Sequence, residues 1–204
     1  MGLLDILLGR TKPVAPDLDQ LFALPSAAVT LEAAAGFTPT GQGAVCFATV
    51  EGPAFEQTHR EVQALLDADT ERTGPPVRLL RDDYGYSWLV SERAPDQLAQ
   101  LVNDLHAVNS AMEVNGFGPQ LLCSLAGFEK TAGAATGPRT ADGQRLALVY
   151  LYKRGAYYPF APLPGTGRRR DNALELQVKA ALANDLRIEQ DLSRWFPVWG
   201  APGL

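Results

Sequence analysis

The residues of this sequence best suited to metal binding or nucleophilic catalysis are two histidines and two cysteines. They are His59, His106, Cys46 and Cys123, and none lies within a helical turn or a short loop of another. Structural zinc sites use about four such ligands, arranged in closely spaced pairs. The sequence therefore predicts no metal site and no cofactor.

Motifs that carry covalent or phosphate chemistry are also missing. No nucleophile elbow, Walker loop or dinucleotide fingerprint is present. The adjacent carboxylates Asp82 and Asp83 fall in a predicted turn, where aspartate is favoured because it hydrogen-bonds the local backbone. We expect no catalytic residues and no enzyme, although a cleft assembled from scattered residues stays open as an alternative.

Cys46 and Cys123 each lie in an apolar stretch of the sequence. A free thiol in such surroundings behaves as a small hydrophobic side chain, so we expect two reduced core cysteines. A disulfide between them would require the two stretches to be neighbours in space.

The N-terminus is the first of three segments that could bind a partner. It combines apolar residues with a basic edge: Leu3, Leu4, Ile6, Leu7 and Leu8, followed by Arg10 and Lys12. Such a segment could lie in a membrane interface or dock into a groove of a partner protein. The alternative is that it folds back onto its own domain or frays.

An arginine run and an aromatic cluster near the C-terminus are the other two. Arg168, Arg169 and Arg170 directly precede an expected helix, where they could bind a phosphate or a carboxylate cluster, or form a solvated charge run. The aromatic residues Trp195, Phe196 and Trp199 could form an interaction hot spot, or pack on the core of their own chain.

Composition excludes several classes of partner. The formal net charge of −5 argues against a nucleic-acid-binding protein, which needs clustered lysine and arginine. No run of about 18 apolar residues could span a membrane, and the N-terminus does not resemble a secretion signal. We therefore expect a cytoplasmic protein, at most in peripheral contact with the inner face of the cell membrane.

The periodicity of apolar residues predicts an N-terminal segment and linker over residues 1–16 and one α+β domain over residues 17–204. The expected helices cover residues 17–36 with a break at Pro25, 53–68, 96–115 and 171–194. Strands are expected at 43–49 and 121–129, with hairpins at 77–92 and 145–162.

The predicted fold is an antiparallel sheet covered by helices. Residues 17–93 and 96–162 share a Pro-Asp helix start, a Gly-Phe turn and a cysteine-bearing strand at similar spacing. This indicates an internal duplication of a helix–strand–strand–strand unit, with the helix at 53–68 inserted in the first copy. The sheet edges of such a fold would also allow a homodimer.

Three strings of residues carry a family resemblance: Met1 to Arg10, residues 16–27 and residues 43–47. They resemble the actinobacterial PspA-associated protein PspAB family. The resemblance implies a role beside PspA, a coiled-coil protein that protects stressed membranes, and an association with HtpX-type membrane metalloproteases. It supplies no catalytic residues. The order of elements also looks like that of secretion chaperones and YbjN-type proteins.

The favoured hypothesis is thus an accessory or adaptor protein of a membrane-stress system. One alternative is a chaperone-like module that holds an apolar segment of a client protein. Another is a small-ligand or phosphate-binding domain with a pocket near Arg168–Arg170, lined by one of the tyrosines Tyr150, Tyr152, Tyr157 or Tyr158.

Overall fold

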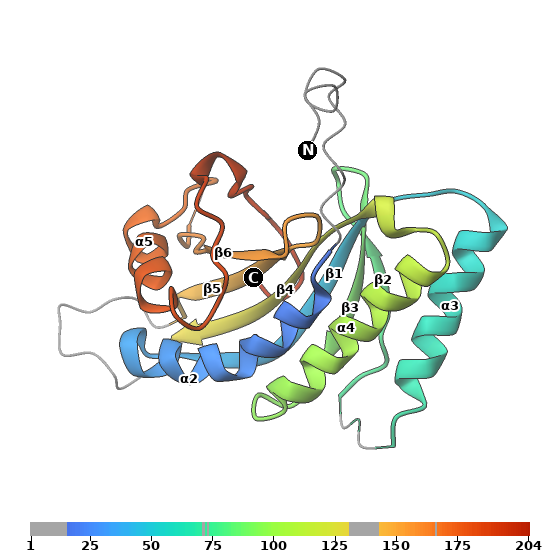
Figure 1. Cartoon of the computed structure of the whole chain (residues 1–204), viewed down its shortest axis with the longest axis horizontal. Coiled ribbons are helices and arrows are strands. Elements are labelled where there is room, and N and C mark those ends of the chain that lie inside the picture. The colour runs from blue at the N-terminus through green and yellow to red at the C-terminus, as the bar shows by residue number, and fades with distance from the viewer. Residues whose placement is uncertain (1–15, 71, 73, 131–142, 166) are drawn as a thin grey trace, which may run out of the picture.

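A six-stranded sheet forms the centre of the protein (Figure 1). The computed structural model describes residues 16–70, 72, 74–130, 143–165 and 167–204. The strands are β1 (Phe37–Ala48), β2 (Arg78–Arg81), β3 (Tyr86–Glu92), β4 (Leu121–Lys130), β5 (Arg145–Leu151) and β6 (Ala156–Phe160). Their order is β2-β3-β1-β4-β5-β6, and all neighbouring pairs are antiparallel.

Within the described residues, four α-helices pack with the sheet and confirm the predicted α+β class. They are α2 (Leu24–Ala35), α3 (Pro53–Asp67), α4 (Leu98–Val114) and α5 (Asn172–Ala181). Short 3-10 turns occupy η1 (Leu18–Ala23), η2 (Gly118–Gln120) and η3 (Leu192–Arg194). No helix in the described part of the chain has the length and apolar character needed to cross a membrane. The predicted docking segment from Leu3 to Lys12 lies outside the described residues.

Helices α2, α4 and α3 lie side by side along one face of the sheet (Figure 1). The apolar stripe of α4 includes Leu105, Val108 and Met112, which join Val45 and Phe47 of β1 in one buried cluster. Gly116 then ends this region with a φ of 84°, a conformation that glycine adopts without steric cost. The apolar stripe of α4 and the glycine after its end are the features that predict this helix from the sequence.

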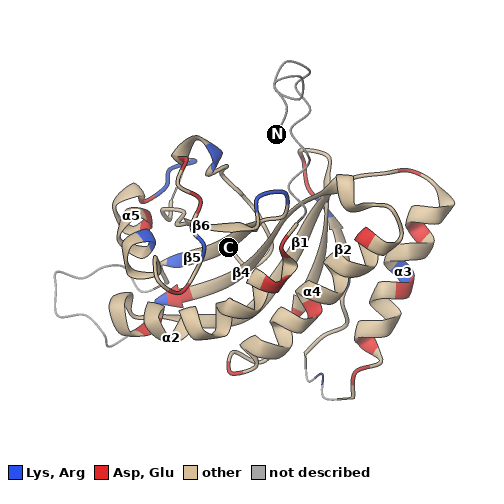
Figure 2. Ribbon diagram, in the orientation of Figure 1, with Lys and Arg blue, Asp and Glu red and all other residues tan. Residues whose placement is uncertain are grey.

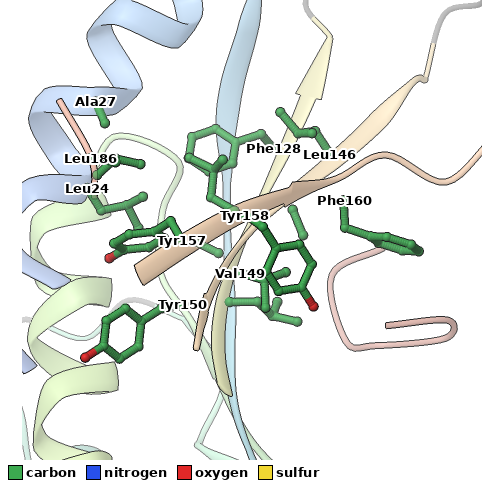
Figure 3. Packing of buried hydrophobic residues seen from close by; sticks show 14 of the residues in the cluster. Leu24, Ala27, Phe128, Leu146, Val149, Tyr150, Tyr157, Tyr158, Phe160 and Leu186 are labelled. Carbon is green, nitrogen blue, oxygen red and sulfur yellow. The ribbon is translucent and has the colours of Figure 1, made fainter. Parts of the chain in front are cut away.

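The tyrosines of β5 and β6 divide between the two faces of the sheet (Figure 3). Tyr150 and Tyr157 point toward the helices, where the Tyr150 hydroxyl donates to the Asp17 carbonyl at 2.8 Å. Tyr158 and Phe160 point the other way. Successive side chains of a strand alternate between faces, so this division follows directly from the sequence.

The chain after α5 covers part of the second face and corrects one prediction. A helix is expected to continue to residue 194, but α5 ends at Ala181. After Ala181 the backbone forms hydrogen bonds with strand β6 instead of continuing the helix. The Tyr157 N–H donates to the Arg187 carbonyl at 2.7 Å, and the Glu189 N–H donates to the Tyr157 carbonyl at 2.8 Å. We call residues 183–204 the C-terminal segment. Part of its backbone is hydrogen-bonded to the sheet.

The two halves of the chain follow the expected order of elements but differ in strand pairing. In the second half β4 pairs with β5, the next strand in sequence. In the first half β1 pairs with β3 and leaves β2 at the edge. Helix α3 lies between β1 and β2 and lets the chain reach the edge before it returns. The duplication stays a prediction, since the strand order is not repeated.

Candidate functional site

A row of side chains crosses the sheet on the face opposite the helices. The row consists of successive pairs of residues that lie directly opposite each other on neighbouring strands. These residues are Trp88 of β3, Cys46 of β1, Cys123 of β4 and Leu151 of β5. Directly paired residues in antiparallel strands share a face. These four side chains therefore form an apolar floor in the middle of the sheet.

The turn of the β2–β3 hairpin makes one wall beside this floor. Asp82 Oδ1 accepts hydrogen bonds from the backbone N–H groups of Tyr84 and Tyr86, each at 2.9 Å. Its Oδ2 accepts from Trp88 Nε1–H at 2.9 Å. Burial of Asp82 acts to raise its pKa, but these hydrogen bonds outweigh it and lower the pKa. Asp82 thus has the local backbone role predicted for it and also orients Trp88.

The C-terminal segment makes the opposite wall. The Tyr158 hydroxyl donates to the Phe196 carbonyl at 2.7 Å, and the ring of Trp199 meets Phe160 edge-on at 4.9 Å. Phe196 keeps 61% of its surface exposed. The segment is therefore anchored by its backbone and by Trp199, while Phe196 is left available at the surface.

Between these walls lies a pocket of about 720 Å³. Its apolar lining includes the four floor residues together with Leu122, Tyr158, Phe196 and Trp199. A second hollow of about 380 Å³ shares Tyr84, Trp88 and Trp199 with the pocket and extends toward Leu80 and Pro202. The volume of the larger pocket falls in the range of about 300–1,000 Å³ usual for ligand sites.

Charged side chains at the rim are mainly basic. The lining contains four basic side chains and one carboxylate, that of Asp82. The basic residues are Lys153, Arg154, Arg168 and Arg194. This excess of positive charge contrasts with the net charge of −5 for the whole chain. Figure 2 shows basic residues in the turn between β5 and β6, whereas α3 and α4 carry mostly acidic ones. The pocket therefore offers a cationic rim over an apolar floor, which suits an anionic partner with an apolar part.

Two of the rim cations are held by carboxylates outside the pocket lining. Arg154 Nε lies 2.8 Å from Glu189 Oε2, and Arg194 Nε lies 3.1 Å from an oxygen of Asp191. Burial acts to raise the pKa of Glu189, but the hydrogen bonds from Arg154 and from the Asp191 N–H group together outweigh it, so this pKa is lowered. Arg168 instead lies over the Tyr84 ring, 5.3 Å from its centroid. Arg168 and Lys153 are thus the cations best placed to meet an anion.

The structure separates the three predicted arginines. Arg168 lines the pocket and Arg169 is exposed beside it. Arg170 instead donates from Nε to Glu175 Oε1 at 2.8 Å and from Nη1 to the Trp195 carbonyl at 2.7 Å. These two hydrogen bonds tie Arg170 to α5 and to the C-terminal segment, away from Arg168.

The aromatic cluster also divides. Phe196 and Trp199 line the pocket, but Trp195 is 5% exposed and stacks on Tyr158 with ring centroids 6.0 Å apart. Its Nε1–H donates to the Glu189 carbonyl at 3.0 Å. Trp195 therefore follows the packing alternative. Phe196 and Trp199 share the pocket with Arg168 and Tyr158, and a tyrosine-lined pocket near the arginine run is the condition that the small-ligand alternative sets.

Trp88, Leu122 and Leu151 of the pocket escape prediction from the sequence. Each lies in an expected strand or hairpin, but the pairing that brings them to one place depends on β1 meeting β3 and β4. The matched positions of Cys46 and Cys123 in the two apparent repeats are the one signal that could have indicated the floor. Both cysteines are free and buried, as expected.

A metal centre does not emerge from the described residues. They contain no group of three or more histidine, cysteine, aspartate or glutamate side chains that could hold an ion. The described lining of the pocket instead presents aromatic rings, guanidinium groups and a pair of thiols.

Fold and site together define an α+β sheet protein with an open apolar pocket under a basic rim. The family model of PspA associated protein B (PspAB) matches residues 1–203 of the chain, and the chain belongs to this family. Membership links it to the PspA stress system. No curated protein and no solved structure matches it.

Proposed function

We propose that this protein is a non-enzymatic accessory protein of a PspA-type membrane-stress system that docks a segment of its protein partner in the pocket. The single observation that supports this role most is the apolar floor under a cationic rim. The PspA-like coiled coil is the partner that the family name favours. An HtpX-type membrane protease is the second candidate, and either would bring the protein to the inner face of the membrane.

The lining of the pocket indicates what the docked segment should contain. Phe196 and Trp199 expose aromatic surface, and Arg168 and Lys153 stand beside it. Aromatic and arginine side chains dominate the energetics of protein interfaces, and guanidinium groups bind carboxylates with two parallel hydrogen bonds. A segment with large apolar side chains flanked by aspartate or glutamate would satisfy both parts of the pocket.

Binding of purified PspA from the same organism, measured by isothermal titration calorimetry, tests the proposal. We expect Arg168→Glu and Phe196→Ala each to weaken binding about tenfold or more, as interface anchors do. Arg60→Glu, on the exposed side of α3, makes the same charge change far from the pocket and should bind like the native chain. Native affinity in both pocket variants would overturn the docking site.

The native chain also has to bind at least one of the two family-implied partners. If the native chain binds neither PspA nor an HtpX-type protease in detergent, the accessory role itself is overturned. A chain lacking residues 1–12 distinguishes the surfaces: loss of binding in this chain alone would assign the contact to the N-terminal segment and not to the pocket.

A small anionic amphiphile is the second candidate for the pocket. The observation in its favour is that Tyr158 and Arg168 line one cavity of ligand size, as the small-ligand hypothesis requires. A fatty acid titrated into the protein would then quench the fluorescence of Trp88 or Trp199 with saturation. The chaperone-like alternative, and the likeness to secretion chaperones, would instead require capture of unrelated apolar peptides without a carboxylate.

A further inference from the structure

The two cysteines of the chain face each other at the centre of the sheet. Cys46 on β1 and Cys123 on β4 are directly paired in the antiparallel register. Directly paired residues have Cα atoms about 4.5 or 5.5 Å apart and Cβ atoms about 4.5–5.5 Å apart. A disulfide needs Cα atoms about 4.4–6.8 Å apart and Cβ atoms about 3.5–4.5 Å apart. A small approach of the two side chains would therefore suffice to join them.

A break in the strand ladder lies beside this pair. The register of β1 and β4 shifts between Cys46 and Phe47, where Leu122 is left without a direct partner. Such a bulge interrupts the ladder of backbone hydrogen bonds and lets the strand bend locally. The backbone next to the cysteines can thus adjust without disturbing the regular pairing of Gly43 to Val45.

Both thiols line the pocket, which gives them a route to solvent. Cys46 is 4% exposed and Cys123 is 7% exposed, yet both line the cavity of about 720 Å³. A small reagent that enters the cavity would meet the two sulfur atoms together. Since the chain holds two cysteines in all, an intramolecular disulfide has one pairing available.

The surroundings of the two cysteines make the Cys46 thiol difficult to deprotonate. Hydrogen bonding with the Cys123 thiol, and then burial, raise the pKa of the Cys46 thiol. The attacking species in thiol–disulfide exchange is the thiolate, so reaction near neutral pH should be slow and should accelerate as the pH rises. The pair would stay reduced under ordinary reducing conditions.

We propose that Cys46 and Cys123 form a reversible redox-modification site on the floor of the pocket, whose co-substrate is a low-molecular-weight disulfide. One cysteine attacks the small disulfide, forms a mixed disulfide and releases one small thiol. The second cysteine then attacks the sulfur of the first and releases the other small thiol. Two electrons pass to the small disulfide, and the two cysteine protons end on the two thiols released.

This site does not depend on the proposed docking function, because the disulfide would form in the isolated chain. It would nevertheless change the same pocket, since a bond between β1 and β4 replaces two thiols at the floor. Its test therefore uses the chain alone and leaves partner binding out.

The experiment treats the full chain with bis(2-hydroxyethyl) disulfide at about pH 7 and about pH 9, followed by N-ethylmaleimide under denaturing conditions and intact-mass analysis. We expect both thiols to disappear together, with loss of two hydrogens and no adduct, and a peptide that links Cys46 to Cys123. The rate should rise roughly tenfold per pH unit, and dithiothreitol should reverse the reaction.

Single variants show whether the pocket admits the reagent. Cys46→Ser and Cys123→Ser should each accumulate one 2-hydroxyethylthio adduct (a mixed disulfide), because no second thiol is present to release it. Two results would overturn the proposal: a native chain that carries two adducts without a disulfide, or thiols that stay unreacted at both pH values while the single variants are labelled. Labelling in none of the three folded chains would overturn it equally, since the pocket would then not admit a small disulfide.

Discussion

At the scale of single residues, the buried Asp104 holds two arginine side chains in place inside the protein. Asp104 of α4 is 2% exposed and accepts hydrogen bonds from Arg93 Nε at 2.8 Å, Arg93 Nη2 at 2.7 Å, Arg72 Nη2 at 2.8 Å and Ser91 Oγ at 2.6 Å. The hydrogen bonds from Arg93 to Asp104 raise the pKa of Arg93, so its charge is held firmly. This network joins α4 to β3 and to the chain after α3.

Removing the charge of Asp104 should therefore be costly. Asp104→Asn leaves the buried guanidinium group of Arg72 without its carboxylate and leaves Arg93 with Asp69 alone. Removing one partner of a buried pair typically costs about 3–5 kcal/mol. Urea denaturation should show a loss of this size in the free energy of unfolding. Asp96→Asn, an exposed change near the start of the same helix, should stay within about 0.5 kcal/mol of the native chain. Equal effects of the two changes would contradict the assigned role.

The tyrosines predict a fall in stability at alkaline pH. Burial, with help from the nearby Glu113, raises the pKa of Tyr152 to about 12. Burial likewise raises the pKa of Tyr150, Tyr157 and Tyr158. Below pH of about 10 these groups are neutral in both states. Above it the unfolded chain loses protons that the folded chain keeps, so the free energy of unfolding must fall as pH rises.

Thermal unfolding followed by circular dichroism between pH of about 8 and about 11 checks this sign. The transition temperature should decline above pH of about 10, and Tyr152→Phe should flatten part of the decline because its ring cannot ionise. A transition temperature that rises over this range would show that the hydroxyl groups ionise more easily in the folded protein.

At the scale of elements, the sequence predicts helices and strands whose apolar residues recur periodically. It does not predict element ends that depend on contacts with residues far away in the sequence. Helix α4 is predictable because its apolar residues recur at helical spacing and Gly116 stops it. The two hairpins are predictable from their turn residues. The end of α5 is not, because residues after Ala181 exchange helical hydrogen bonds for contacts with Tyr157, a residue far away in sequence.

The C-terminal segment should depend on one of its aromatic residues far more than on another. Trp195 is buried and hydrogen-bonded, whereas Phe196 is mostly exposed. Trp195→Ala should lower the free energy of unfolding by about 3–5 kcal/mol, as removal of a core aromatic does. Phe196→Ala should change it by less than about 0.5 kcal/mol. Equal losses in urea denaturation would mean that Phe196 also packs in the interior.

At the scale of the whole molecule, the fold class follows from the sequence but the site does not. The alternating strands and amphipathic helices predict an antiparallel sheet with helices, and the sheet confirms it. The pocket needs β1 to pair with β3 and β4, and the C-terminal segment to turn back over the second face. Arg168 and Trp199 are found in sequence as separate features; only the fold places both at one cavity.

The pocket is the proposed docking site for the protein's partner. Phe196 lines it and is 61% exposed, whereas Val29 on α2 is 70% exposed and does not line it. A photo-crosslinking amino acid placed at each position in turn can be irradiated with purified PspA of the same organism. The proposed docking site predicts a covalent adduct from position 196 and none from position 29. Adducts from position 29 with none from position 196 would contradict it.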